Sequence, residues 1–127
     1  MEWYDQNRRD LPWRRTKDPY AILVSEVMLQ QTTVNTVIPY YERWVRDYPC
    51  IEKVASAPLE RLLKNWQGLG YYQRAKNIHK AAGFFLREHK GRIPQDPDLL
   101  KNVPGFGPYT THAVLSIAFD KPLALVD

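Results

Sequence analysis

The stretch that decides the fold is Val103-Pro104-Gly105-Phe106-Gly107-Pro108-Tyr109-Thr110. Two glycines one residue apart let the backbone turn tightly and expose amide donors to a phosphate. Apolar residues at helical spacing flank the turn: Leu99, Leu100 and Val103 before it, and Ala113, Val114, Ile117 and Ala118 after it. The pattern predicts a helix-hairpin-helix over about 96–118 that grips a DNA backbone without reading bases. The alternative is a glycine-rich turn between packed helices.

Positive charge is concentrated in one segment of the chain. The whole sequence has 18 Lys and Arg against 14 Asp and Glu, a net charge of +4. Residues 60–92 contain eight basic and two acidic side chains, a local net charge of +6. Such a cluster usually marks a solvated helix face, but beside a hairpin suited to phosphate it favours nucleic acid.

Length and composition predict one domain, residues 1–127, since 44% hydrophobic residues can fill a core of that size. The sequence has neither an apolar run of roughly twenty residues nor a signal peptide, so we expect a soluble protein inside the cell. We also expect it to be a monomer, in the cytoplasm or nucleoid of a prokaryote. Cys50 is the only cysteine, and His79, His89 and His112 lack ligand spacing. No metal site is therefore predicted in this chain.

Helical periodicity, without a convincing alternating stretch, predicts an all-α fold. Asp18 is expected to cap a helix that has Pro19 at its first position. Further helices are expected from about Val34, where Pro39 bends the helix or marks its start, from Pro58 to Gly68, from Tyr71 to a cap at Gly91, and on both sides of the hairpin.

Glu26 is a charged residue in an apolar setting, with Ile22 and Leu23 one turn before it and Val27 beside it. If the side chain faces the core, burial raises the pKa of the carboxyl and makes it a general acid near neutral pH. The alternative is a side chain that points to solvent between two buried faces.

Several motifs occur in one order along the chain: Leu11-Pro12-Trp13-Arg14, Asp18-Pro19-Tyr20, Ser25-Glu26-Val27-Met28-Leu29-Gln30-Gln31-Thr32, Gly68-Leu69-Gly70-Tyr71-Tyr72 with Arg74-Ala75, the hairpin, and Val126-Asp127. In this order they resemble the adenine DNA glycosylases of the MutY type, within the helix-hairpin-helix DNA glycosylase superfamily. The resemblance covers nearly the whole chain. It implies a helical barrel domain with a helix-hairpin-helix motif, the catalytic core of a larger protein.

The resemblance also implies a reaction, the hydrolysis of the N-glycosidic bond of adenine mispaired with 8-oxoguanine or guanine in double-stranded DNA, after the base has left the stack. Glu26 would protonate the purine ring, and Asp127 would stabilise the positive sugar and direct water. Tyr109 stands where lyase-competent relatives carry lysine, so the enzyme is expected to be monofunctional.

DNA-binding roles follow from the same resemblance. Gln31 and Tyr71 would wedge into the duplex, Leu69 and Thr32 would lie beside them, Arg14 would approach the extruded adenine, and Gly105 and Gly107 would hold phosphate in the hairpin. From the residues alone, ordinary core packing is the alternative for Tyr71 and Leu69.

The family pattern extends beyond this sequence. Members continue past the aspartate to four cysteines that hold a 4Fe-4S cluster, and many add a domain that recognises 8-oxoguanine. Neither is present here, so no cofactor is expected in this chain. Asp127 is the last residue and its terminal carboxylate adds a charge, so the sequence does not predict that the isolated chain is active.

Two other functions are compatible with parts of the pattern. A glycosylase that removes thymine opposite guanine shares the hairpin, the tyrosine and the aspartate, but Gln30-Gln31 and residues 68–72 favour the adenine enzyme. A hairpin module that binds DNA without chemistry is the third interpretation. Carboxylates at both Glu26 and Asp127 argue against it.

Overall fold

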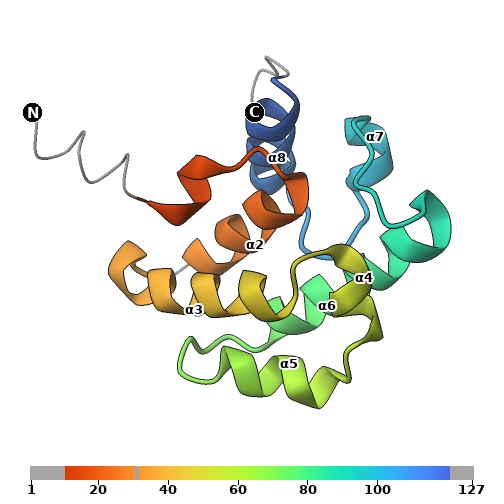
Figure 1. Ribbon diagram of the computed structural model, residues 1–127. Coiled ribbons are helices and arrows are strands. Elements are labelled where there is room, and N and C mark those ends of the chain that lie inside the picture. Colours follow the sequence, from red (N-terminus) through yellow and green to blue (C-terminus); the bar gives the residue numbers. More distant parts are fainter. Residues whose placement is uncertain (1–10, 31, 121–127) are drawn as a thin grey trace, which may run out of the picture.

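Asp18 and Pro19 start the first long helix, as the sequence predicts. The Asp18 carboxylate accepts a hydrogen bond from the Tyr20 amide at 3.2 Å, and proline at the first position has a φ suited to the helix. The helix is α2, Pro19–Leu29, and Figure 1 shows it near the middle of the molecule in the computed structural model, which describes residues 11–30 and 32–120.

The part of the chain that the structure describes contains helices and no strand, so the all-α prediction is confirmed. A 3-10 helix, η1 (Pro12–Arg15), precedes α2. The remaining helices are α3 (Val34–Asp47), α4 (Ile51–Ser56), α5 (Leu59–Trp66), α6 (Gln73–His89), α7 (Pro97–Leu100) and α8 (Pro108–Phe119). Within this described part, no helix has the length and apolar character needed to cross a membrane.

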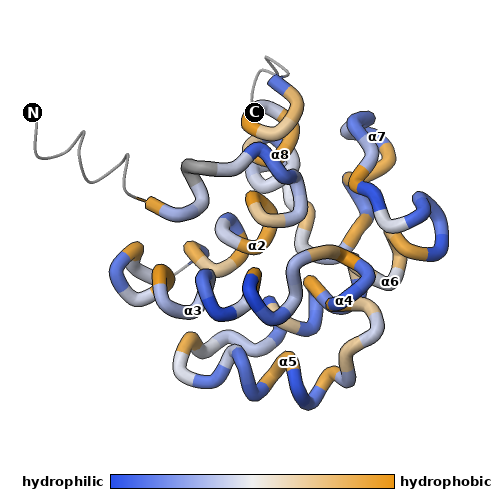
Figure 2. Tube along the Cα trace, viewed as in Figure 1, coloured by the Kyte–Doolittle hydropathy of each residue, from blue (hydrophilic) through white to orange (hydrophobic). Residues whose placement is uncertain are grey.

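Helices α2 and α8 lie side by side and run antiparallel (Figure 1). At one end of the pair, Lys17 forms an ion pair with Asp120 at 3.1 Å. At the other end, the Gln30 amide contacts Thr110. Figure 2 shows α2 mostly in the apolar colours, whereas α3 and α5 alternate between polar and apolar. A helix that is apolar on all sides belongs in the interior.

Aromatic side chains join α2 to α3 and α5. The rings of Trp44 and Trp66 meet edge to face, with centroids 5.5 Å apart. Trp44 Nε1 donates to the Tyr20 hydroxyl at 2.9 Å, and that hydroxyl donates to the Tyr48 carbonyl at 2.6 Å. Every polar atom named here is buried and has a partner, which fixes the start of α2 against α3.

The structure decides one local alternative, corrects one helix cap and adds one helix. Helix α3 begins at Val34, as predicted, and Pro39 lies inside it, so the alternative that Pro39 marks the start is excluded. Helix α6 ends in a cap at Lys90, whose φ is 57°, one residue before the predicted Gly91. Helix α4 was not predicted, because six residues between two prolines are too few to show a helical period.

The hairpin helices are correctly placed, but two of their residues are not in the core. Leu100, Val103 and Val114 are buried as predicted, whereas Leu99 is 48% exposed and Ile117 is 44% exposed. Helix α7 has only four residues, of which Leu100 is buried. It is too short to bury the wider apolar face, including Leu99, that the spacing in the sequence indicates.

Candidate functional site

The hairpin turn between α7 and α8 is anchored on α6. The Val103 amide donates to the Leu100 carbonyl and the Phe106 amide to the Val103 carbonyl, both at 3.0 Å. The Phe106 side chain is buried and meets Phe85 of α6 edge to face, with ring centroids 5.7 Å apart. The turn is therefore held by two backbone hydrogen bonds and by the packing of Phe106 on α6, while its glycines lie at the surface.

The two glycines of the turn have different conformations. Gly105 has a φ of +88°, which favours glycine, whereas Gly107 has a φ of −70° and caps α8. Among the described residues, no backbone carbonyl accepts from the amides of Gly105, Gly107 or Tyr109. These amides stand at the positive end of a helix, an arrangement that binds phosphate.

Glu26 is the only charged residue of α2, and its side chain is half-buried. Gln30 lies one turn farther along the same face. Its Nε2 donates to Oγ1 of the buried Thr110 at 3.3 Å. The face of α2 that carries Glu26 is therefore turned toward the first turn of α8. The sequence left open whether the Glu26 side chain faces the core or points to solvent, and the half-buried side chain lies between these two arrangements.

Tyr109, beside Thr110, is 70% exposed and lies at the same end of the α2–α8 pair as Gln30. The structure thus brings the hairpin amides and the C-terminal half of α2 to one end of the molecule. Gln31 and Asp127 lie outside the described residues. Arg14 is part of η1, and its side chain is not described.

The loop of residues 67–72, between α5 and α6, has an unusual backbone. Gly68, Gly70 and Tyr71 all have positive φ, at 101°, 75° and 54°. The Tyr71 side chain is 59% exposed, while Leu69 is buried in the core. Core packing therefore describes Leu69 but not Tyr71. A tyrosine in the left-handed region is strained, and such strain is common where a side chain must be presented for function.

Arg74 is a buried cation that sequence reasoning placed only in the basic cluster and in a family motif. It is 8% exposed. Its Nη1 donates to the carbonyls of Val27 at 2.7 Å and Met28 at 3.0 Å, and also to that of Gln30. Its Nη2 donates to Thr32 Oγ1 at 3.3 Å. The guanidinium thus occupies the negative C-terminal end of α2.

The same guanidinium contacts the 67–72 loop. Nη2 also reaches the Gly70 carbonyl at 3.4 Å, and that carbonyl accepts from Trp66 Nε1 at 2.9 Å. The guanidinium carbon lies 5.5 Å from the Trp66 ring centroid and 5.3 Å from that of Tyr71. Burial lowers the pKa of Arg74, and the nearby Tyr71 opposes that shift. Because these contacts join distant segments, no local pattern could have revealed them.

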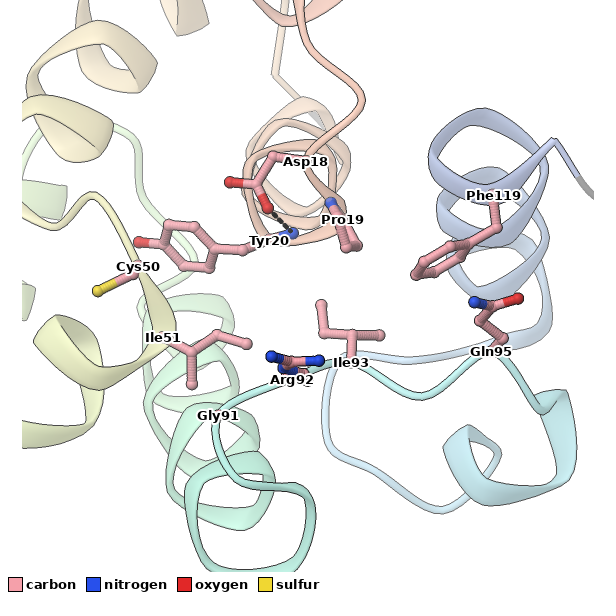
Figure 3. A pocket seen from close by; sticks show the side chains of 10 residues that line it. All are labelled: Asp18, Pro19, Tyr20, Cys50, Ile51, Gly91, Arg92, Ile93, Gln95 and Phe119. Atoms are coloured by element: carbon pink, nitrogen blue, oxygen red, sulfur yellow. Dashed lines mark hydrogen bonds between the residues drawn. The ribbon is translucent and has the colours of Figure 1, made fainter.

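A cavity of about 320 Å³ lies at the other end of the α2–α8 pair. Figure 3 shows Ile93 and Phe119 in its wall, with Asp18 hydrogen-bonded to the Tyr20 amide at the start of α2. The eleven residues of α2 rise by roughly 16 Å, at about 1.5 Å each. The cavity is therefore separate from the end of α2 where Gln30 meets α8.

The fold and hairpin agree with comparisons to known proteins. Residues 24–127 match the family model described as HhH-GPD superfamily base excision DNA repair protein. The chain belongs to this superfamily. The helical fold with its hairpin, expected from the motifs, is thereby confirmed.

Relatives within the HhH-GPD superfamily include adenine DNA glycosylases. The chain is 46% identical to that of Rattus norvegicus over 136 aligned residues, covering all of this chain and 26% of the relative. It is 41% identical to that of Mycolicibacterium smegmatis, covering all of this chain and 44% of the relative. The resemblance to adenine DNA glycosylases is confirmed, and the chain spans less than half the length of these relatives.

Solved structures of the superfamily have the same fold. A thermostable thymine-DNA glycosylase superposes with a TM-score of 0.87 at 35% identity, over 99% of this chain and 58% of that chain. A trapped endonuclease III-DNA covalent intermediate superposes with a TM-score of 0.79 at 31% identity, over 87% of this chain and 52% of that chain. The fold is therefore compatible with more than one glycosylase specificity.

An iron-sulfur cluster does not fit the residues present. The sequence contains one cysteine, Cys50, while a cluster of this kind is held by four. Within residues 11–30 and 32–120, no group of His, Cys, Asp and Glu is placed to hold a metal ion.

Proposed function

We propose that this chain is the catalytic core of a monofunctional adenine DNA glycosylase. Its reaction is hydrolysis of the N-glycosidic bond of adenine mispaired with 8-oxoguanine or guanine in double-stranded DNA. Relatives at 40–46% identity over nearly the whole chain support the specificity. The observation that carries the proposal is the single half-buried carboxyl of an otherwise uncharged α2, Glu26, on the face that meets the first turn of α8.

Glu26 acts in this proposal as the general acid. A carboxyl that lies within reach of the base can give a proton to the purine ring, as a general acid does. Protonation turns adenine into a better leaving group. Asp127, at the end of the sequence, would stabilise the positive sugar and direct the water that attacks it.

Binding of the duplex is assigned to two surfaces. The unpaired amides of the hairpin hold a phosphate of the backbone, which positions the duplex without selecting a sequence. Exposed Tyr71 fills the gap that the extruded base leaves. Gln31, Thr32, Leu69 and Arg14 remain proposed contacts; buried Leu69 would have to leave the core to reach DNA. A 4Fe-4S cluster would belong to family segments outside this chain.

A single-turnover assay of the intact protein tests the proposal. Four duplexes are compared: adenine opposite 8-oxoguanine, adenine opposite guanine, thymine opposite guanine, and a fully matched duplex. We expect adenine release from the first two, without strand cleavage. Intact adenine in both would overturn the proposal.

A thymine-guanine mismatch glycosylase is the second candidate, since a thymine-DNA glycosylase superposes over 99% of this chain with a TM-score of 0.87. Release of thymine, with adenine left in place, would establish that function instead. A module that binds DNA without chemistry would release neither base. The same four duplexes therefore separate all three candidates.

A further inference from the structure

Two loops carry most of the proposed contacts to the mispair, and one buried arginine contacts both. The first lies between α2 and α3 and is called the 30–33 loop, of which the structure describes Gln30, Thr32 and Thr33; the second is residues 67–72, between α5 and α6. Arg74 Nη2 donates to Thr32 Oγ1 at 3.3 Å in the first and to the Gly70 carbonyl at 3.4 Å in the second. One rigid planar group therefore bridges the two loops.

Building on the proposed function, we propose that Arg74 is a positioning residue. It fixes the 30–33 loop and the 67–72 loop relative to each other, so that the Tyr71 ring enters the duplex in register with the base that leaves it. Arg74 itself touches neither the base nor the sugar; it acts through Tyr71, and Thr32 is its anchor in the other loop.

The contact geometry requires an arginine. The guanidinium has five N–H donors in a rigid plane and flat faces that stack on rings, whereas lysine offers a point charge with three donors. In this protein the guanidinium donates hydrogen bonds both to carbonyls at the end of α2 and to the Gly70 carbonyl of the 67–72 loop. The ring centroids of Trp66 and Tyr71 lie 5.5 and 5.3 Å from the guanidinium carbon. Lysine cannot make these contacts together.

The acceptors themselves argue for a role in positioning. They are carbonyl and hydroxyl oxygens of residues 27–32 and 70. Burying a cation against such oxygens is a costly way to gain stability, since an apolar side chain of similar volume often stabilises as well. What the cation supplies is a fixed geometry between segments more than 35 residues apart in sequence, together with a surface for the strained Tyr71.

The test compares four variants of the intact protein: Arg74→Lys, Tyr71→Ala, the double variant, and Arg46→Lys as a matched control on the exposed face of α3. Single-turnover adenine release is measured at saturating enzyme on duplex with adenine opposite 8-oxoguanine. Affinity for matched duplex and the melting temperature are measured alongside. We expect Arg74→Lys to slow release more than tenfold and to change matched-duplex affinity less than threefold, while Arg46→Lys changes neither.

The double-mutant cycle separates positioning from general stability. If Arg74 acts through Tyr71, Arg74→Lys in the Tyr71→Ala background slows release less than threefold. The proposal is overturned if the rate losses of the two single variants multiply in the double variant. It is also overturned if Arg74→Lys releases adenine at the wild-type rate. Should Arg74→Lys fail to fold, Trp66→Phe replaces it, because it removes the hydrogen bond to the Gly70 carbonyl and part of the ring surface beside the guanidinium; it also loses part of the buried contact with Trp44, which the melting temperature reports.

Amide hydrogen exchange provides a readout that does not need activity. In Arg74→Lys, or in its replacement, we expect the amides of residues 30–33 and 67–72 to lose protection together while α3 keeps its own. A response confined to one loop, or absent from both, would overturn the coupling. If the wild-type protein releases no adenine from any duplex, the proposed function fails, and exchange alone decides whether Arg74 couples the loops.

Discussion

Gln30 Nε2 donates to Thr110 Oγ1 at 3.3 Å, and this bond ties the C-terminal end of α2 to the first turn of α8. It brings the turn that carries Glu26 to the same end of the molecule as the hairpin amides. The proposed proton donor and the proposed phosphate site are thereby held by one pair of packed helices.

Glu26→Gln tests the proton donor. The amide has nearly the same shape and cannot supply a proton, so we expect adenine release to slow by about 10² to 10⁴. Binding to mismatched duplex should stay within a few-fold. Glu42→Gln, on the exposed face of α3, is the control for the lost charge. Release near the wild-type rate under single-turnover conditions would contradict the role of Glu26.

The two hairpin glycines make a matched pair. A Cβ at Gly107 meets nothing within 4 Å and its φ is −70°, so Gly107→Ala should fold normally. In the proposed complex with DNA, the added methyl group would stand where the phosphate approaches the hairpin amides. We therefore expect matched and mismatched duplex to bind about tenfold more weakly, by similar factors.

Gly105→Ala should behave differently, because its φ of +88° is unfavourable for alanine. We expect it to lower the free energy of unfolding by about 1–2 kcal/mol, which thermal denaturation measures. If Gly107→Ala weakens only mismatch binding, the hairpin does more than hold phosphate.

Tyr109→Lys tests the position assigned to the lyase lysine. An amine there could displace adenine at the sugar C1′ and form a Schiff base, which borohydride would trap as a covalent complex. Since position 109 is 70% exposed, the lysine should keep a pKa near 10.4 and be mostly protonated at neutral pH. We expect weak trapping that increases from pH 7 to pH 9. Adenine release without trapping at either pH would show that position 109 does not face the sugar.

Three tyrosines should make the fold sensitive to alkali. Burial raises the pKa of Tyr20, Tyr41 and Tyr48. In the unfolded chain these hydroxyls lose protons near pH 10. Native protein then binds more protons than unfolded protein, so stability that is fully present below about pH 10 falls as the pH rises further. Denaturant titrations between pH 7 and 11 measure the decline.

Tyr20→Phe separates the two contributions of that residue. The change leaves Trp44 Nε1 and the Tyr48 carbonyl without their buried partner, which should cost about 1–3 kcal/mol at pH 7. It should also make the alkaline decline shallower. Tyr40→Phe, which loses an exposed hydrogen bond to the Gln67 carbonyl, should cost less. Equal losses for the two variants would contradict this account.

Local signals in the sequence were sufficient for much of the fold. Asp18 and Pro19 mark the start of α2, and the hairpin glycines mark the turn before α8, because caps and tight turns depend on neighbouring residues. Helix α4 was missed because its place against α6 comes from packing rather than periodicity. The exposure of Leu99 likewise depends on how short α7 is.

The candidate site was predicted less completely. Glu26 stood out because one charge interrupts an apolar helix. Arg74 could not be distinguished from its exposed basic neighbours, since its acceptors lie more than 40 residues earlier, at Val27 and Met28. Leu69 and Tyr71 are two residues apart and have opposite environments, which backbone conformation decides.

The left-handed backbone of Tyr71 has a consequence for laboratory evolution of this protein. Glycine and asparagine adopt that conformation at lower cost than tyrosine. A library selected for heat resistance alone would therefore favour those residues at position 71, and each gain would remove the ring that the loop exposes. Heat resistance and the proposed release of adenine would therefore have to be selected in the same round.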